Sequence, residues 1–90
     1  MKLREVIFTD NLPTIDLHGF DALSARVKIN EFIKDNLIMK NEIIVIVHGI
    51  GTGILKDITH KTLKSNKKVV EYMLFYRNNG MTIVQLDIDK

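Results

Sequence analysis

The sequence predicts a single α/β domain whose elements run in the order β-α-β-α-β-β. Its clearest strand is residues 43–47, a segment that is apolar at every position and therefore suits a strand covered on both faces. Segments with helical spacing of their apolar residues stand on either side of this strand. Residues 78–80, Asn-Asn-Gly, separate two final β-type segments and predict a turn that joins them as an antiparallel hairpin. We therefore expect a mixed sheet, parallel at its start and antiparallel at its end.

Length and composition indicate one small domain that folds without covalent cross-links. The chain has 90 residues, of which 46% are hydrophobic, and it contains no cysteine, so the core must stabilise the fold by itself. A secretory signal is not visible, and no segment approaches the roughly 20 apolar residues of a membrane span. The net charge is only +2. We expect a cytoplasmic protein with no membrane contact.

The first half of the chain contains a lead-in, a strand and a long helix. Residues 1–13 form the lead-in to a domain of residues 14–90, and residues 6–8 are expected either to form a short strand or to pack on the domain's edge. Residues 14–17 form the first strand. Asp21 caps a helix that ends near Met39. Its buried face follows from helical spacing: Ala22, Ala25, Ile29, Phe32, Ile33 and Leu37.

The second half adds a strand, a helix and a hairpin. After the strand at 43–47, a helix runs from about Thr52 to Asn66. Its expected buried residues are Ile54, Leu55, Ile58 and Leu63. Residues 69–77 and 81–88 form the last two strands. The first two crossovers should be right-handed.

Two short segments carry the candidate site: residues 15–19, Ile-Asp-Leu-His-Gly, and residues 47–53, Val-His-Gly-Ile-Gly-Thr-Gly. Each places a histidine and a glycine where a strand ends, and parallel neighbours would bring both segments to the same edge of the sheet. In the second segment, Gly49, Gly51, Thr52 and Gly53 lead into a helix, an arrangement whose N–H groups and dipole attract anions. We expect Asp16, His18 and His48 to share one phosphate-binding site with this loop.

Lysines follow the glycine loop and give the site a second source of positive charge. Lys56 comes first, and Lys61, Lys64, Lys67 and Lys68 continue the series. Such a row either neutralises phosphates or forms an ordinary solvated helix face. Beside a glycine loop, the first interpretation indicates nucleic acid as the partner.

Several familiar motifs are excluded. The glycine spacing is not that of the G-x-G-x-x-G dinucleotide fingerprint, and no Gly-Lys-Ser/Thr of a phosphate-binding P-loop follows. No serine occupies a strand-to-helix elbow, as a serine hydrolase would need. A zinc site is not expected, because the chain has no cysteine and His60 should lie too far along its helix from the other two histidines.

Purely structural explanations stay open for single residues. Gly19 can serve only as a turn residue, Asp16 can cap backbone amides, and His18 can be an ordinary loop histidine. The alternating glycines of the loop are harder to explain structurally, because each raises the entropic cost of folding. They indicate the close approach of a ligand or of another backbone segment.

Three motifs together resemble those of the Smr (small MutS-related) domain. They are Asp16-Leu17-His18-Gly19, His48-Gly49-x-Gly51-x-Gly53 and Gly80-x-Thr82-x-Val84-x-Leu86, and the resemblance covers residues 14 to 88. Smr domains occur at the C-terminus of MutS2 proteins and as stand-alone chains. The resemblance implies a two-layer α/β sandwich like the C-terminal domain of translation initiation factor three, with two helices on one face of a four-stranded mixed sheet. Here Ile15 replaces the family's leucine, and Asn79-Gly80 replaces its usual glycine pair.

The resemblance also implies nucleic-acid binding and, in many members, endonuclease (nicking) activity on DNA or RNA. Asp16 and His18 match the residues credited with cleavage. Our hypothesis is that the amides of residues 49 to 53 hold a phosphate and that His18 acts as general acid or base, with Asp16 either orienting His18 or helping to keep it protonated. His48 would stabilise phosphate charge, and Lys56 would grip the nucleic-acid backbone.

The alternative is a module that binds nucleic acid, a ribosome or a DNA-repair complex without catalysis. No organic cofactor is expected for either function. No residue set resembles a two-metal carboxylate clamp, so we expect metal to be dispensable or indirect.

Overall fold

The computed structural model describes residues 3–6 and 8–88. After a short 3-10 helix η1 (Leu3–Glu5) come β1 (Thr14–Asp16), α1 (Ala22–Ile38), β2 (Ile43–Val47), α2 (Ile54–Ser65), β3 (Val69–Phe75) and β4 (Asn78–Leu86). This is the predicted order, β-α-β-α-β-β. Of the two alternatives expected for residues 6–8, a short strand or packing on the domain's edge, Val6 follows the second and packs in the core. Phe8 is exposed, and Ile7 lies outside the described residues.

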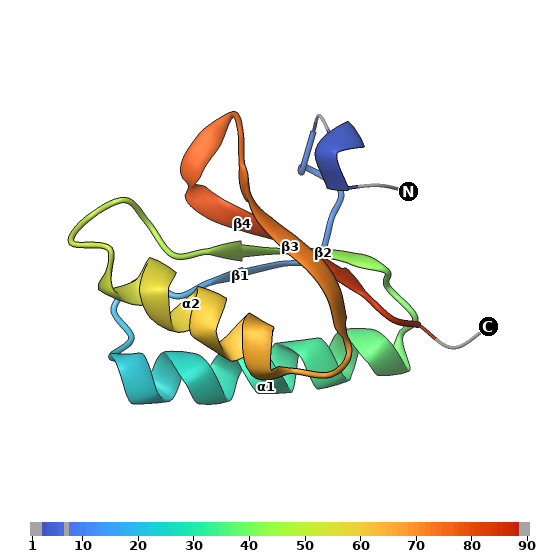
Figure 1. Ribbon diagram of the computed structural model, residues 1–90, viewed down its shortest axis with the longest axis horizontal. Helices are drawn as coiled ribbons and strands as arrows, with labels where there is room; N and C mark the ends of the chain where they lie inside the picture. Colours follow the sequence, from blue (N-terminus) through green and yellow to red (C-terminus); the bar gives the residue numbers. More distant parts are fainter. Residues whose placement is uncertain (1–2, 7, 89–90) are drawn as a thin grey trace.

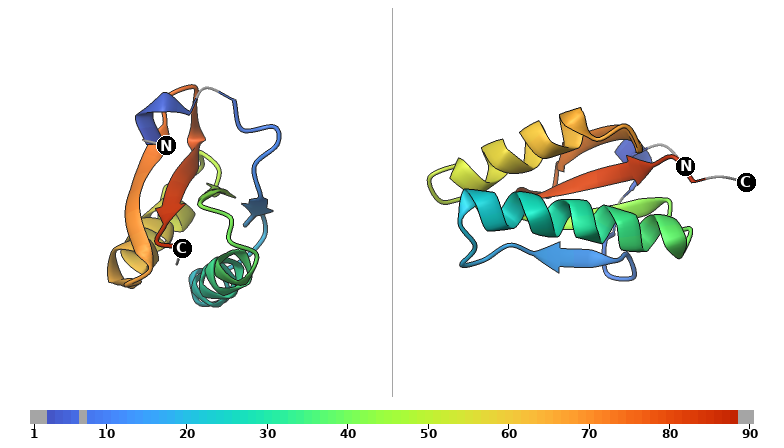
Figure 2. Two further views of the ribbon diagram at one scale, coloured as in Figure 1. Left: turned by 90° about the vertical axis from the view of Figure 1, so that its right-hand side faces the viewer. Right: turned by 90° about the horizontal axis from the view of Figure 1, so that it is seen from below.

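The four strands form one mixed sheet in the order β1-β2-β4-β3. β1 and β2 are parallel, whereas β4 is antiparallel to both of its neighbours. The two crossovers, from β1 to β2 and from β2 to β3, advance in the same direction across the sheet. Because both crossovers have the same handedness, they place both helices on the same face of the sheet, as Figures 1 and 2 show. The expected two-layer α/β sandwich is confirmed.

Strand β2 shows why an uninterrupted apolar segment is needed at the centre. Ile44 and Ile46 belong to the core under the helices. Ile43 and Val45 point the other way, into a second core that Leu3 and Val6 of the N-terminal segment complete. Because successive side chains of a strand alternate between faces, a sheet covered on both sides needs apolar residues at every position.

Helix α1 begins and ends as its sequence predicts. The Asp21 carboxylate accepts a 2.7 Å hydrogen bond from the backbone N–H of Ser24, which lowers the pKa of Asp21. Met39 is the C-cap. Ala25, Ile29 and Ile33 are buried, and Phe32 and Leu37 pack against the same core.

Helix α2 differs from the prediction at its start. It begins at Ile54 because Gly53, its N-cap, has a left-handed conformation with φ of 85° and therefore does not continue a helix toward Thr52. Ile54 is 60% exposed, so the prediction that it is buried is wrong. Thr59 and Thr62 are buried instead, and each hydroxyl donates a 2.7 Å hydrogen bond to the carbonyl four residues earlier.

The hairpin turn lies earlier than predicted. Phe75 pairs with Asn78, so the turn consists of Tyr76 and Arg77, and β4 already begins at Asn78. The reason for Gly80 is close approach rather than a turn: a Cβ there would lie 3.4 Å from the backbone of Gly49. No helix within the described ranges is long and apolar enough to cross a membrane.

Candidate functional site

The two glycine-containing segments lie side by side at one end of the sheet. Asp16 of β1 is paired with Val47 of β2, and the Leu17 N–H donates a 2.9 Å hydrogen bond to the Val47 carbonyl. Just beyond this bond the chain turns at His18 on one strand and enters the loop at His48 on the other. The predicted adjacency of the two segments is confirmed.

His18 occupies an exposed tight turn that Asp16 supports. The Phe20 N–H donates to the Leu17 carbonyl at 3.0 Å, and Gly19 within this turn has φ of 83°, a conformation that favours glycine. The Asp16 carboxylate accepts a 2.9 Å hydrogen bond from the backbone N–H of His18. Asp16 therefore holds the main chain that carries His18, whereas we had expected it to orient the imidazole.

The loop of residues 49–53, here called the glycine loop, exposes a row of main-chain donors. At its start, the N–H groups of His48 and Gly49 both donate to the carbonyl of Gly80, at 2.9 and 3.0 Å. The N–H groups of residues 50–53, in contrast, have no hydrogen-bond acceptor in the part of the chain that the structure describes. They precede the positive end of the α2 dipole, an arrangement that favours negative charge.

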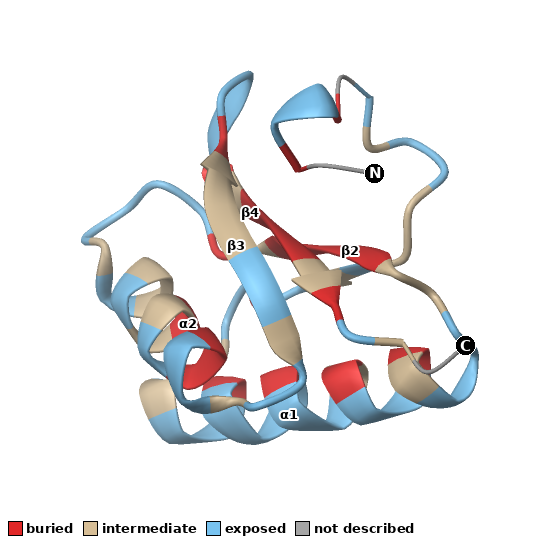
Figure 3. Ribbon diagram, turned by 45° about the vertical axis from the view of Figure 1, so that its right-hand side comes forward, coloured by how far each residue is buried: buried red, intermediate tan, exposed pale blue. Residues whose placement is uncertain are grey.

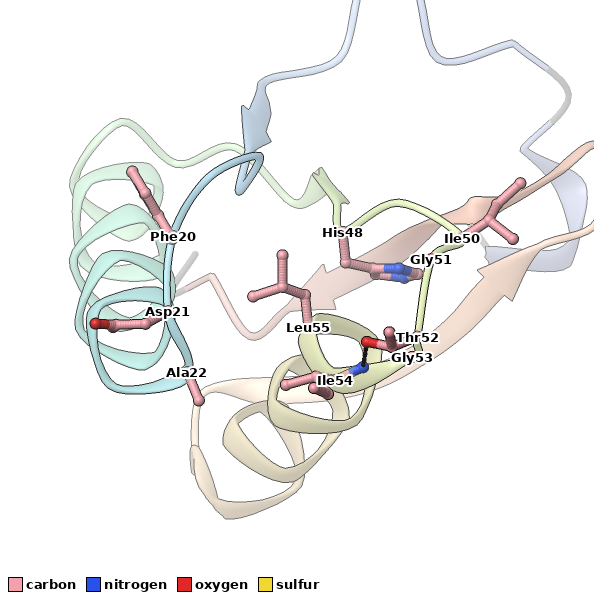
Figure 4. Close-up of a pocket in the computed structure, with 10 residues that line it drawn as sticks. All are labelled: Phe20, Asp21, Ala22, His48, Ile50, Gly51, Thr52, Gly53, Ile54 and Leu55. Atoms are coloured by element: carbon pink, nitrogen blue, oxygen red, sulfur yellow. Dashed lines mark hydrogen bonds between the residues drawn. The ribbon is translucent and has the colours of Figure 1, made fainter.

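A pocket of about 440 Å³ opens between the glycine loop and the start of α1 (Figure 4). The Asp21 carboxylate, at the rim, points away from the loop because it caps α1. Thr52 accepts a long 3.4 Å hydrogen bond from the Ile54 N–H and so braces the first turn of α2. The pocket is lined by Phe20, Asp21, Ala22, His48, Ile50, Gly51, Thr52, Gly53, Ile54 and Leu55.

His48 lines this pocket, but its ring is held by the protein at both nitrogens. Its side chain is buried, with Nδ1 at 3.0 Å from the Gly49 carbonyl and Nε2 at 2.8 Å from the Thr82 hydroxyl. Both ring nitrogens are thus engaged within the protein. The expectation that His48 stabilises phosphate charge stays a prediction, and in this structure both of its ring nitrogens already have partners within the protein.

His60 joins this arrangement, contrary to the prediction that it lies too far away. Its ring centroid is 6.0 Å from that of His48, and its Nε2 lies 2.9 Å from the same Thr82 hydroxyl. The signal was present in the sequence: His60 follows Lys56 by one helical turn and precedes Leu63 by one, on the face of α2 toward the sheet. Among residues 3–6 and 8–88, no group of three or more His, Asp or Glu side chains is placed to hold a metal ion.

The hydrogen-bond partners of His48, His60 and Thr82 determine which ring nitrogens carry a hydrogen. A carbonyl only accepts, so Nδ1 of His48 carries a hydrogen for Gly49. A neutral His48 then accepts at Nε2 from the Thr82 hydroxyl. Thr82 has no second hydrogen, so His60 donates to it from Nε2. One hydroxyl thereby sets the tautomers of two imidazoles.

Burial keeps both imidazoles neutral. Desolvation is the main cause that lowers the pKa of His48, and the positive charge of Lys56 lowers it further. The pKa of His60 is lowered by desolvation first, then by His48 and Lys56, with Asp57 acting in the opposite direction. Protonation of His48 would put a hydrogen on the Nε2 atom that accepts from Thr82, so this hydrogen bond requires the neutral form of His48.

The lysines do not form a single patch at the loop. Lys56 is half-buried on the first turn of α2, beside the glycine loop. Lys61 and Lys64 continue along the helix, whereas Lys68 lies at the far end of the domain, in a recess it shares with Lys40 and Asp87. None of these lysines forms an ion pair within the described residues.

Comparison with known proteins assigns the chain to a family. The model of the Smr domain matches residues 15–87. Endonuclease MutS2 of Streptococcus mutans is 37% identical over 73 residues, which are 78% of this chain and 9% of that protein. Endonuclease MutS2 of Halothermothrix orenii is 31% identical over 77 residues, 82% of this chain and 10% of that protein. The chain thus spans about a tenth of the length of these relatives.

Two solved structures share the fold. The Smr domain of Thermus thermophilus MutS2 superposes with a TM-score of 0.81 at 22% identity, covering 83% of this chain and 98% of that one. YdaL, a stand-alone small MutS-related protein from Escherichia coli, gives a TM-score of 0.77 at 20% identity, covering 81% of this chain and 63% of that one. From its sequence motifs, its sheet and its match to the family model, the chain belongs to the Smr domain family.

Proposed function

We propose that this chain binds DNA or RNA at the glycine loop and cleaves a phosphodiester bond held there. One observation carries the proposal: the free N–H groups of residues 50–53 lie at the same edge of the sheet as the exposed turn of His18. Anion-binding amides beside a side chain that can transfer a proton are what backbone cleavage requires. The relatives named Endonuclease MutS2 are consistent with this reaction class.

In this proposal the loop binds and the histidine reacts. The loop amides bind the non-bridging oxygens of one phosphate, and Lys56 adds positive charge from the first turn of α2. His18 accepts the proton of the attacking hydroxyl, or donates one to the leaving oxygen, as the new P–O bond forms and the old one breaks. Asp16 positions His18 by fixing its turn, through the hydrogen bond to the His18 N–H.

A Gly51→Val variant tests whether the loop is the binding surface. Gly51 has no positive φ, and a Cβ there meets nothing within 4 Å, so the fold accepts a side chain at this position. The valine side chain would stand over the amides that bind phosphate. We expect the affinity for a fluorescent oligonucleotide to fall at least about tenfold, the loss of roughly one charge-assisted hydrogen bond.

The free energy of unfolding, measured in urea, provides the control for this variant. It should fall by no more than about 0.5 kcal/mol relative to the parent, as expected for an exposed substitution. Unchanged affinity in a folded Gly51→Val protein would show that nucleic acid, if it binds, binds elsewhere.

A second candidate is a module that binds nucleic acid, or docks on a ribosome or DNA-repair complex, without cleaving. The position of Asp16 favours it, because this carboxylate accepts from the main chain of His18, and no residue among those the structure describes forms an ion pair with the His18 imidazole. Both candidate functions use the glycine loop as the binding surface. They differ only in whether His18 takes part in cleavage.

A further inference from the structure

Two exposed aromatic rings and an arginine gather at the tip of the β3–β4 hairpin. The Arg77 guanidinium carbon lies 5.5 Å from the ring centroid of Phe8 and 5.8 Å from that of Tyr76. Arg77 Nε also donates a 3.2 Å hydrogen bond to the Tyr76 hydroxyl. Figure 1 shows this hairpin rising from the sheet on the side away from the helices, next to the N-terminal segment. We call Phe8, Tyr76 and Arg77 the hairpin cluster.

The cluster is open to solvent, and its Tyr76 ring packs on the core. Phe8 is 70% exposed and Tyr76 is 64% exposed, and the hairpin tip is among the exposed parts in Figure 3. The Tyr76 ring packs edge to face on Phe75, at 5.4 Å between centroids, and Phe75 is buried in the second core. A ring held in this way offers its face without the entropic cost of first being ordered.

The surroundings add apolar surface and positive charge. A recess of about 330 Å³ beside Tyr76 is lined by Leu3, Arg4, Met73, Leu74, Tyr76 and Ile83. Within the described ranges, Arg77 forms no ion pair with a carboxylate. The ligand that fits such a surface is therefore flat, apolar on its faces and linked to negative charge.

The hairpin cluster is also close to the glycine loop. The Gly80 carbonyl accepts from the N–H groups of His48 and Gly49, so the base of β4 touches the start of the loop. Arg77 precedes Gly80 by three positions, and three residues of extended chain span at most about 10 Å. One strand of nucleic acid can thus reach both places.

We propose that the hairpin cluster stacks unpaired nucleobases of the same strand whose phosphate lies in the glycine loop. This inference rests on the proposed function and makes it more specific: the preferred substrate has a single-stranded segment at the site. Aromatic faces and arginine planes bind bases by stacking, whatever their sequence. A fully paired duplex hides its base faces and gains nothing from the hairpin cluster.

Two fluorescent oligonucleotides of about 12 nucleotides, within the range of single-strand binding sites, test the inference. One is oligo-dT, and the other is a strand of abasic residues with the same phosphates and no bases. We expect the parent protein to bind oligo-dT at least about fivefold more tightly in anisotropy titrations at equal salt. Equal affinity for the two strands would overturn the stacking inference and leave loop binding intact.

Variants locate the effect. Tyr76→Leu and Phe8→Leu keep apolar bulk and remove a π-face, so each should lower the affinity for oligo-dT by about fivefold or more and leave the abasic strand unchanged. Ile38→Ala, a matched control at the far end of α1 where Ile38 is 72% exposed, should change neither affinity.

The remaining outcomes are equally decisive. If Tyr76→Leu and Phe8→Leu keep the parent's preference for bases, the cluster is not the stacking surface, and its exposed rings are left as candidates for contact with another protein. If the parent binds neither strand, the proposed function fails and this inference fails with it. The Gly51→Val variant should bind both strands more weakly than the parent and should still prefer oligo-dT to the abasic strand. This result would show that the phosphate and the bases bind at two separate positions, as proposed.

Discussion

His48 and His60 share one hydroxyl group. Their Nε2 atoms lie 2.8 and 2.9 Å from Oγ1 of Thr82, and their rings meet edge to face with centroids 6.0 Å apart. The contact joins the start of the glycine loop to α2 and to β4. The loop therefore has its own buried support, separate from the N–H groups it presents to a ligand.

A Thr82→Val substitution should destabilise the protein because it leaves two imidazole nitrogens without partners. Valine has nearly the same shape, so the loss is that of the hydroxyl: about 1–3 kcal/mol of unfolding free energy for buried groups left unsatisfied. Urea denaturation measures it. Thr82→Ser, which keeps the hydroxyl, should lose only about 1 kcal/mol for the missing methyl group. A Val variant as stable as the parent would mean that the shared hydroxyl contributes nothing.

The free energy of unfolding should fall on mild acidification. Folding lowers the pKa of His48 and of His60 below the ordinary histidine value of 6.5, so the unfolded chain binds protons that the folded one does not. The stabilisation is complete above pH 6.5 and is lost as the pH falls below it. The slope is at most about 1.4 kcal/mol per pH unit for each imidazole.

Thermal unfolding between pH 8 and pH 5 measures this dependence, and His60→Gln is the matched variant. An amide can still donate to Thr82 but does not titrate, so the slope should decrease while stability at pH 8 is largely kept. An identical slope in both proteins would exclude His60 as a source of the effect.

Substitutions at Gly51 and Gly53 should have opposite effects on stability. Gly53 has φ of 85°, where an alanine is strained, so Gly53→Ala should cost about 1–2 kcal/mol. Gly51 has no positive φ and open space around it, so Gly51→Ala should gain about 0.4–1 kcal/mol through the unfolded state. Equal effects at the two positions in urea denaturation would contradict the loop conformation.

The salt dependence of binding should identify Lys56 as the lysine that contacts phosphate. Removing one phosphate contact reduces the slope of log affinity against log salt by about 0.7–0.9. Lys56→Gln should show this reduction. Lys68→Gln, at the far end of the domain, should keep the parent's slope. A reduced slope for Lys68→Gln and an unchanged slope for Lys56→Gln would show that nucleic acid binds away from the glycine loop.

Much of the fold could be predicted from local patterns, and the errors lie where tertiary contacts decide. The uninterrupted apolar segment of β2, covered on both faces, and the Asp21 cap are properties of adjacent residues, and both are confirmed. The hairpin turn was misplaced because Asn-Asn-Gly reads locally as a turn, whereas Gly80 is needed for its contact with Gly49 across the sheet. No local pattern shows that contact.

In the candidate site, too, local sequence patterns predicted some features, and tertiary contacts decided the others. That the His18 turn and the glycine loop would be neighbours followed from two parallel strands, and the structure confirms it. The meeting of His60 with His48 depends on how α2 packs over β4, so sequence distance along the helix was misleading. Thr82, a polar residue among the alternating apolar positions of β4, was the available clue to a buried partner.

Cleavage by the parent protein and by His18→Ala is the most direct test of the account. Purified proteins are incubated with end-labelled single- and double-stranded DNA and RNA, with and without chelator, and the products are separated on denaturing gels. The account predicts that the parent cleaves at least one substrate and that His18→Ala is slower by roughly 10²–10⁴-fold at nearly unchanged affinity, the range for losing a positioned acid or base. Equal cleavage rates for the two proteins, or binding by both with cleavage by neither, would contradict catalysis by His18.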